Sequence, residues 1–487
     1  MNHAALRNFS CLIAGLLMAC AAGAQQLNFT PFHANGIYAL GDKVGWTVAP
    51  APGTKPTTTF SYTVKTNQTV VIGSGSFDLS SGSATITVPA DQPAMVQVYV
   101  DAAGAPPPGQ PSPAEADQVN DNLKALLAKS DPALRTILDK YPSYCLIGAP
   151  CGTEAPDLGP SPPRELHLAV LGAAVDPTGL QPTAPRPADF DAFWAAKLAA
   201  LKKVPINPVL TSLPTAQPGV KLYMVQLDSL GSHVHGYLAL PSGKGPFPAM
   251  IIYQWAGVYK LQTEWATNRA AEGWLVFDVD SHDVTPDQTG GVPKDYYEVG
   301  NTSRETSYFL NMYLRDTRAL DFVTTLPHWN KKTVVFTGTS MGGQQSLVTA
   351  ALNPGRVSAV VVNVPSGADS NAELHGRKAA YPNWAVSDPR VAETALYFDT
   401  VNFAPRIKAP TMIAVGFIDT IACPAGDWTA FDRIAGPKEI VPMPESDHNN
   451  YTPDKEGAFF QRSEEVLATL LHGGRFNPNP AASLPQP

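Results

Sequence analysis

The segment Gly338-Thr339-Ser340-Met341-Gly342 has the residue types that place a serine nucleophile on a tight turn. It follows a β-rich apolar run, residues 333–336, and precedes a helix-like stretch, residues 344–352. The flanking glycines allow close backbone approach, and the helix N-terminus offers free N–H groups beside the reacting atoms. A strand before and a helix after the motif separate it from a chance match in a structural turn. The pattern therefore predicts that Ser340 is a catalytic nucleophile.

A serine hydroxyl needs a general base, which in strand–turn–helix hydrolases comes after the acid in chain order. Three histidines follow Ser340, namely His375, His448 and His472. We expect His375 in a segment between sheet strands and His472 on the surface near the end of a terminal helix. His448 follows the expected last strand, residues 439–443, where a loop can reach the serine. His448 is therefore the predicted base.

The acid is expected where the preceding strand leaves the sheet, and Asp419 follows the apolar run 411–415 at that place. Its rivals are Asp427 and Asp432, expected on the solvated face of the next helix, and Asp447. Asp447 is adjacent in sequence to the predicted base, and adjacent side chains on an extended loop usually diverge. Asp419 is predicted to hold the imidazole Nδ1–H and to stabilise the imidazolium as it forms.

Two backbone N–H groups are needed to stabilise an oxyanion. One is expected from Met341, the residue after the nucleophile, and the other from Ala256 in the loop after an earlier β-rich run. Trp255 and Tyr259, in and just after that loop, are predicted to line a substrate pocket. For Trp265, ordinary core packing is at least as good an interpretation.

Two other groups of polar residues have weaker signals. His233 and His235 place two imidazoles on one face of a strand and could bind a metal, but no cluster of carboxylates or cysteines accompanies them in the sequence. Asp278 and Asp280 alternate at a strand end, where loop hydrogen bonding is the better interpretation. The sequence therefore predicts no metal site and no cofactor.

The elements expected around these residues alternate between strands and helices. Residues 182–187 read as a linker, and a helix is expected from residue 190, capped by Asp189. A hairpin of residues 220–227 and 234–240 follows. Further strands are expected at 249–253, 274–279, 333–336, 357–362 and 411–415. Such alternation predicts a mainly parallel sheet with helices on both faces, here an α/β-hydrolase domain over residues 186–473.

The region before this domain, residues 25–185, has a different pattern. Short alternating runs in residues 28–101 predict an antiparallel β-sandwich. A Pro-rich break and two helix-like stretches predict a helical insertion at about residues 106–163. Residues 166–175 read as a returning strand.

Cysteine usage indicates an oxidising compartment. Cys145 and Cys151 bracket a short stretch that can turn, which predicts a disulfide, although two unpaired buried thiols are the alternative. Cys423 would then be left unpaired.

Residues 1–24 read as a signal peptide, with Arg7 before a short apolar run and small residues before Gln25. A lipoprotein signal ending at Cys20 is the second interpretation. These features predict a secreted or periplasmic protein without a transmembrane segment. Residues 474–487 are Pro-rich and expected to be disordered. The net charge of -8 gives no basic footprint for nucleic acid.

Residues 187–471 resemble the acetyl xylan esterase/cephalosporin-C deacetylase family of carbohydrate esterases. The resemblance rests on Arg186-Pro-Ala-Asp-Phe-Asp-Ala-Phe-Trp194, His235-Gly-Tyr-Leu, Ala435-Gly-Pro-Lys-Glu-Ile440 and, most specifically, Tyr397-Phe-Asp-Thr-Val-Asn-Phe-Ala-Pro-Arg-Ile-Lys-Ala-Pro410. It implies removal of acetyl groups from sugars or similar small esters. The serine, aspartate and histidine of the family fall on Ser340, Asp419 and His448.

The chain also departs from the pattern of that family. Met341 stands where glutamine is usual, Ala256 where tyrosine is usual, and Ala425 where a second proline is usual. The segment from Asp419 to the Cys-Pro pair is one residue longer than expected. Asp280-Ser-His-Asp283 replaces the usual Arg-Gly-Gln-Gly. These changes leave the triad intact and fall on the expected acyl pocket.

Two other classes of function compete with an esterase. A prolyl-oligopeptidase-like peptidase also joins a β domain to a hydrolase domain, but its propeller needs at least four blades of ~40 residues. Residues 25–185 barely reach that length, and their middle reads as helical. A carbohydrate-binding protein with an inactive hydrolase domain is the other class, and the intact order of serine, aspartate and histidine argues against it.

Overall fold

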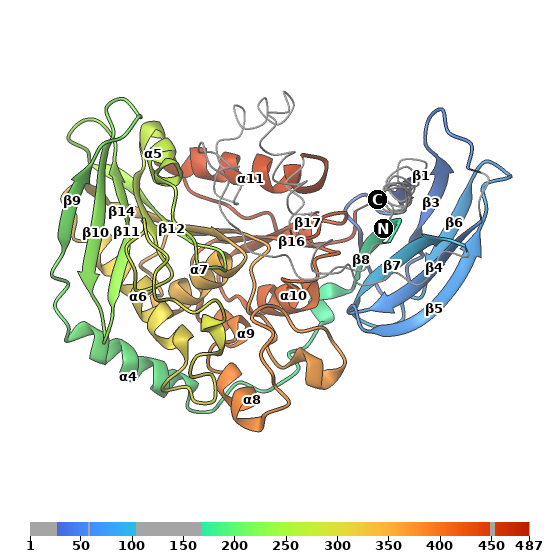
Figure 1. Ribbon diagram of the computed structural model, residues 1–487. Coiled ribbons are helices and arrows are strands. Elements are labelled where there is room, and N and C mark those ends of the chain that lie inside the picture. The colour runs from blue at the N-terminus through green and yellow to red at the C-terminus, as the bar shows by residue number, and fades with distance from the viewer. Residues whose placement is uncertain (1–26, 57–58, 104–166, 449–452, 487) are drawn as a thin grey trace, which may run out of the picture.

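The computed structural model describes residues 27–56, 59–103, 167–448 and 453–486. Two parts are visible in Figure 1: a smaller, all-β part built from the N-terminal strands, and a larger part in which helices cover a long sheet. The predicted signal peptide, Cys145, Cys151 and the predicted insertion lie outside the described residues. No helix among the described residues is long and apolar enough to cross a membrane.

The N-terminal part consists of two sheets that share one hydrophobic core. Alternate apolar residues, such as Trp46, Val48, Val96 and Val98, are buried between them. One sheet has the order β1 (Leu27–Pro31), β3 (Val44–Pro50), β6 (Ala84–Val88). The other has the order β2 (Ile37–Tyr38), β8 (Ala169–Val175), β7 (Ala94–Ala102), β4 (Phe60–Thr66), β5 (Val70–Phe77).

Strands β7 and β8 pair antiparallel, with Val100 opposite Ala169. The chain therefore leaves this sheet after β7 and returns to it beside the place where it left. Strand β8 lies within the run 166–175 that reads as a strand in the sequence.

The larger part is organised around a nine-stranded sheet. Strands β12 to β17 run parallel, and β11, β10 and β9 extend the sheet antiparallel from β13. The predicted hairpin and the predicted mainly parallel sheet are both present. The sheet order is β17 (Lys438–Met443), β16 (Thr411–Gly416), β15 (Ala359–Asn363), β14 (Trp329–Thr339), β12 (Phe247–Tyr253), β13 (Leu275–Val279), β11 (His233–Leu240), β10 (Lys221–Asp228), β9 (Val209–Leu213).

Helices cover both faces of this sheet, because the side chains of each buried strand alternate between two apolar cores. In β12, Ala249 and Ile251 face one core, and Met250 and Ile252 face the other. The first core is covered by α4 (Phe190–Lys202), α6 (Tyr308–Val323), α7 (Met341–Leu352), α8 (Pro389–Ala395), α9 (Thr400–Phe403) and α10 (Pro424–Arg433). The second is covered by α5 (Thr263–Glu272) and α11 (Pro453–Leu471), on the opposite side of the sheet in Figure 1.

The C-terminal segment differs from the expectation of a disordered tail over residues 474–487. A short 3-10 helix, Pro480–Ser483, lies against β17. The Leu484 carbonyl accepts a hydrogen bond from Asn35 Nδ2 at 2.9 Å. Proline content misled the prediction, because Pro starts such a helix without losing a needed backbone donor.

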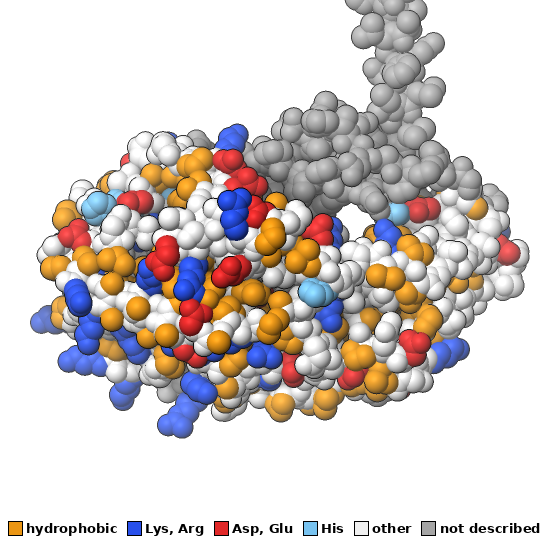
Figure 2. Space-filling view, turned by 90° about the horizontal axis from the view of Figure 1, so that it is seen from below, with side chains coloured by type: hydrophobic (Ala, Val, Ile, Leu, Met, Phe, Trp, Pro, Cys, Tyr) orange, Lys and Arg blue, Asp and Glu red, His pale blue; other side chains and the backbone are white. Residues whose placement is uncertain are grey.

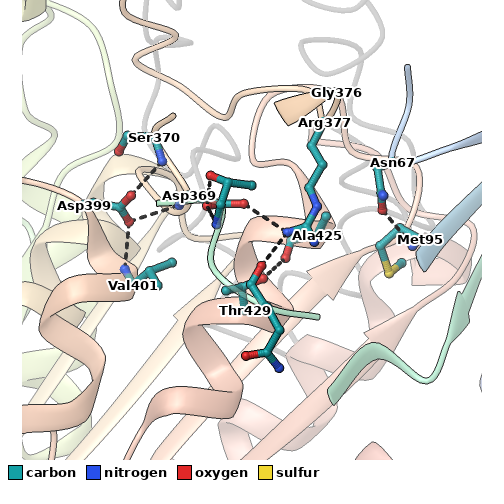
Figure 3. A network of polar contacts seen from close by, with 12 residues as sticks. Asn67, Met95, Asp369, Ser370, Gly376, Arg377, Asp399, Val401, Ala425 and Thr429 are labelled. Atoms are coloured by element: carbon teal, nitrogen blue, oxygen red, sulfur yellow. Dashed lines mark hydrogen bonds and ion pairs between the residues drawn. The ribbon is translucent and has the colours of Figure 1, made fainter. Parts of the chain in front are cut away.

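The segment between β15 and β16 is fixed by a buried polar network (Figure 3). The Asp399 carboxylate accepts hydrogen bonds from the backbone N–H groups of Asp369, Ser370 and Val401 at 2.7–3.0 Å. Asp369 forms an ion pair with Arg377 at 3.2 Å. The network ties together residues 369–401 of the segment between these two strands.

On the face drawn in Figure 2, Lys and Arg side chains gather along the lower left edge, and acidic, basic and hydrophobic side chains are interspersed over the rest. This mixed surface agrees with the modest net charge of -8. No single sign of charge dominates that view.

Candidate active site

Ser340 lies on a strained turn between β14 and α7, with φ 57° and ψ −123°. A Cβ on Gly338 would lie 2.4 Å from the Gly342 carbonyl carbon, and one on Gly342 would lie 2.0 Å from the Tyr253 oxygen. Only glycine fits at both positions. The turn therefore lifts the serine above the carboxyl end of the sheet, as the sequence predicts for such a motif.

Three predicted site residues meet at this turn. His448 Nε2 lies 2.8 Å from Ser340 Oγ, and His448 Nδ1 lies 2.7 Å from Asp419 Oδ2. All three side chains are buried, with exposed fractions of 4% for Ser340, 0% for Asp419 and 7% for His448. With Nδ1–H donated to the carboxylate, Nε2 is the nitrogen available to take the serine proton.

The Asp419 loop orients its carboxylate with backbone donors. Oδ1 accepts hydrogen bonds from the N–H groups of Ile421 and Ala422 at 2.7 and 2.8 Å. Oδ2 remains available to accept the hydrogen bond from His448. Such contacts lock the side chain into a single orientation.

The rival residues lie elsewhere, and one is not as expected. Asp427 is 2% exposed in the first turn of α10, rather than on a solvated face. Asp432 and His375 are exposed, and His472 follows the end of α11. Asp427 is buried because α10 is enclosed almost all round, with residues 424–431 all buried. Periodicity over a ten-residue helix did not reveal that.

The two predicted oxyanion donors lie in segments that a hydrogen-bonded glutamine joins. Met341 is the first residue of α7, and Ala256 lies in the loop after β12. Gln345 Nε2 donates to both the Gln254 carbonyl at 2.9 Å and the Met341 carbonyl at 3.2 Å, which ties this loop to the helix. Within the described part of the chain, the backbone N–H groups of Met341 and Ala256 have no hydrogen-bond acceptor. Neither N–H is therefore committed to another group of the described residues.

The predicted substrate residues are less open than expected. Tyr259 is buried, and its hydroxyl donates within its own loop, to the Trp255 carbonyl or to Gln254 Oε1, each at 3.1 Å. Trp255 is half-buried and stacks on it with ring centroids 4.8 Å apart. Trp265 packs edge-on against Trp255 in the core. Tyr259 therefore supports the loop through these contacts, and Trp255 is the more accessible of the two rings.

Sequence reasoning missed an aromatic cluster beside the nucleophile. The Tyr296 hydroxyl lies 3.2 Å from Met341 Sδ and 2.7 Å from the Tyr381 hydroxyl, and it accepts a hydrogen bond from the Gly257 N–H at 3.3 Å. The cluster fills the space next to the Met341 side chain. Its members come from two excursions far apart in sequence, so no local pattern could have revealed it.

His282 was also missed, and it contacts the loop after β12 that contains Ala256 and Gly257. Its Nε2–H donates to the Gly257 carbonyl at 2.8 Å, and its Nδ1 accepts from the Tyr308 hydroxyl at 2.8 Å. These contacts fit the neutral ring with its proton on Nε2. Burial lowers the pKa of His282 to about 4, so the ring is uncharged at neutral pH.

The acidic residues 278 and 280 form loop contacts, as their sequence positions indicate. Asp278 accepts a hydrogen bond from Gln254 Nε2, and Asp280 accepts one from the His282 N–H at 2.7 Å. Cys423 is buried and free, and burial raises the pKa of its thiol. A reactive role for this thiol is disfavoured.

The two histidines of β11 have a partner that the sequence did not indicate. Asp283, in the loop after β13, lies beside His233 and His235. The sequence shows no cluster of carboxylates beside these histidines, but the fold brings one carboxylate, that of Asp283, to them. β11 pairs with β13, and this pairing brings the two segments together.

Comparison with known proteins supports a family assignment. Residues 178–463 match the family described as Acetyl xylan esterase (AXE1), which is more than half of the chain. The chain belongs to the acetyl xylan esterase family. Its assigned chemistry is that of a carboxylic ester hydrolase acting on small esters, as the sequence predicts.

Individual relatives agree with this assignment. The chain is 30% identical over 298 residues to acetyl esterase Axe7A of Xylanibacter ruminicola, covering 57% of this chain and 68% of that protein. The acetyl xylan esterase of Paenibacillus sp. R4 has 24% identity and a TM-score of 0.53, covering 61% of this chain and 98% of its own. Acetyl xylan esterase 1 of Thermoanaerobacterium sp. has 23% identity and a TM-score of 0.51, covering 58% of this chain and 97% of its own. These structures confirm the α/β-hydrolase fold of the larger part.

Proposed function

We propose that this esterase removes acetyl groups from acetylated xylan, xylo-oligosaccharides or similar small esters through a covalent acyl-enzyme. The observation that carries the mechanism is the continuous chain of contacts from Ser340 Oγ to His448 and from His448 to Asp419. The names of the relatives supply the acetyl and xylan parts of the proposal.

In the first half-reaction, Ser340 Oγ attacks the ester carbonyl carbon as His448 Nε2 takes its proton. Asp419 stabilises the imidazolium, and the N–H groups of Met341 and Ala256 stabilise the oxyanion. His448 then gives the proton to the departing sugar oxygen. The oxyanion collapses, the ester C–O bond breaks, and the acyl group stays bonded to Ser340 Oγ.

In the second half-reaction, water replaces the sugar. His448 takes a proton from the water, whose oxygen attacks the acyl carbon. The tetrahedral intermediate expels Ser340 Oγ, which recovers its proton from His448. The products are a carboxylic acid and the free enzyme.

The crowded space beside Met341 favours a small acyl group. Met341 is fully buried, and its sulfur is 3.2 Å and 3.8 Å from the hydroxyls of Tyr296 and Tyr381. A long acyl chain entering on this side would have to displace these groups. Trp255, at the edge of the oxyanion loop, offers an aromatic face on which a sugar leaving group can stack.

The test pairs Ser340→Ala with a panel of acetylated xylo-oligosaccharides, aryl esters of increasing acyl length and Pro-peptide amides. We expect wild type to favour acetyl esters over eight-carbon esters in kcat/KM. The variant should lose turnover by orders of magnitude and keep its melting temperature. Near-normal turnover in the variant would exclude the triad. A preference for long acyl chains would exclude the acetyl specificity alone.

We also propose that the protein is exported after cleavage of residues 1–24, and that residues 25–185 and 186–473 are its two domains. Export fits the expected disulfide between Cys145 and Cys151. N-terminal sequencing of the mature protein and mass spectrometry of a non-reduced digest test both points. A lipid-modified Cys20 would indicate the lipoprotein alternative, and two free thiols would exclude the disulfide.

A further inference from the structure

A second cluster of chemically capable side chains lies away from the serine, where the β10–β11 hairpin meets the loop after β13. It consists of His233 and His235 on β11 and of Asp283. One potential ligand atom from each residue lies within 4.8 Å of the other two. We propose that these three residues form a binding site for a divalent transition metal of the zinc type.

The distances favour metal ligation over direct hydrogen bonding. Asp283 Oδ1 lies 3.4 Å from His233 Nδ1 and 3.3 Å from His235 Nε2. Two ligands at ~2.0–2.1 Å from a tetrahedral zinc are separated by roughly 3.3–3.4 Å. A good N–H···O hydrogen bond is shorter, about 2.7–3.2 Å. One carboxylate oxygen therefore stands at ligand-to-ligand distance from both imidazoles.

The surroundings are those of a partly preformed site. The His235 side chain is 8% exposed, its Nδ1 has no hydrogen-bond partner among the described residues, and its Nε2 is the nitrogen that faces Asp283. The His233 side chain is 48% exposed and can rotate to close the remaining gap. Its other nitrogen, Nε2, faces Asp228 Oδ1 at 3.9 Å. That carboxylate lies beyond hydrogen-bond distance, so it leaves the ring free to turn.

The chemistry of the donors selects the class of metal. Two imidazoles and one carboxylate suit zinc and its first-row neighbours, whereas Mg²⁺ and Ca²⁺ prefer sets of oxygen ligands. The exposed side of the cluster leaves the fourth position to water. A bound ion would join the hairpin to the loop after β13, in which His282 holds the Gly257 carbonyl.

The test measures metal binding itself. Tag-free protein is treated with a chelator, dialysed and titrated with ZnCl₂ by calorimetry, with parallel thermal unfolding. We expect one zinc per chain and a melting temperature that rises with zinc concentration. His233→Ala and Asp283→Asn should weaken binding by more than the roughly 10- to 100-fold that loss of an outer-shell partner costs.

Two controls make the result specific. His375→Ala removes an exposed histidine outside the cluster and should bind zinc as wild type does. Ser340→Ala should also bind zinc as wild type does. The zinc site can therefore be tested independently of the esterase proposal. The melting temperatures of the metal-free variants show whether they fold. Absence of zinc binding in wild type, or equal binding in folded His233→Ala and Asp283→Asn, would overturn the proposal.

Discussion

Gln97, in the N-terminal β7, donates its side-chain N–H to the Phe417 carbonyl at 3.0 Å, two residues before Asp419. The Gln97 side-chain oxygen accepts the Gln68 N–H at 3.1 Å, and the Gln68 side chain donates to the Asp419 carbonyl. Gln97 is fully buried. The N-terminal sheets therefore support the acid loop of the active site directly.

The first prediction concerns this support. Gln97→Met keeps the volume of the side chain but leaves the Phe417 carbonyl unpaired, which should cost about 1–3 kcal/mol of stability. We also expect kcat to fall severalfold with little change in KM, because the acid would be held less firmly. Thermal unfolding and ester kinetics measure both. The control is Gln92→Met, at an exposed glutamine of the same domain. If Gln97→Met and Gln92→Met have the same stability and the same kcat, Gln97 does not support the acid loop.

The second prediction concerns Glu456 on α11, which is buried and accepts a hydrogen bond from Asn363 Nδ2 at 3.0 Å. Burial raises the pKa of Glu456 well above its usual value, and the negative charges of Asp419 and Asp447 act in the same direction. The folded protein then keeps this proton at pH values where the unfolded chain, with a pKa of about 4.3, has lost it. The contribution of Glu456 to stability should therefore fall as pH rises from about 5 to 8.

Glu456→Gln mimics the protonated acid, so the free energy of unfolding of this variant should fall less over that range than that of wild type. Urea unfolding at a series of pH values gives both curves. Glu373→Gln, at an exposed site, should follow wild type. Parallel curves for wild type and Glu456→Gln would show that Glu456 is ionised in the folded state.

The third prediction concerns acyl selectivity. Met341→Ala should open space beside Ser340 and raise the kcat/KM ratio of butyryl to acetyl esters by roughly tenfold or more, since each accommodated methylene is worth ~1–3 kcal/mol. Tyr296→Phe is the matched control, because it removes the hydroxyl near the sulfur but keeps the ring. If Met341→Ala leaves the butyryl-to-acetyl ratio of kcat/KM unchanged, the acyl group does not bind beside the Met341 side chain.

The fourth prediction concerns the turn that carries the nucleophile. Gly342→Ala would put a Cβ 2.0 Å from the Tyr253 carbonyl oxygen, so the helix and β12 must move apart. We expect a loss of about 1–3 kcal/mol in stability together with a large loss of kcat. Gly290→Ala is the control, because a Cβ there meets nothing within 4 Å. Full activity in Gly342→Ala would mean that the turn tolerates this displacement.

The sequence predicts well what local signals and chain order specify. Ser340 stands in a turn motif between a strand and a helix, which is a local signal in the sequence. Asp419 and His448 each follow a strand of the same parallel sheet. Their side chains converge because parallel strands end at one edge. The contacts made by Tyr296, Gln97 and Asp283 could not be predicted in this way, because they join segments far apart in the chain.

Strands β7 and β8 place Val100 opposite Ala169, although the chain between them is long. The strand ends that flank residues 104–166 are therefore held side by side by the sheet itself, and this pairing sets no length for what connects them. Loop-closure entropy grows only slowly with length, by about 0.6 kcal/mol for each doubling. The pairing of β7 with β8, from which Gln97 reaches the acid loop, therefore sets no narrow limit on the length of the connecting segment. It is the natural place in this esterase to add or exchange a substrate-targeting unit.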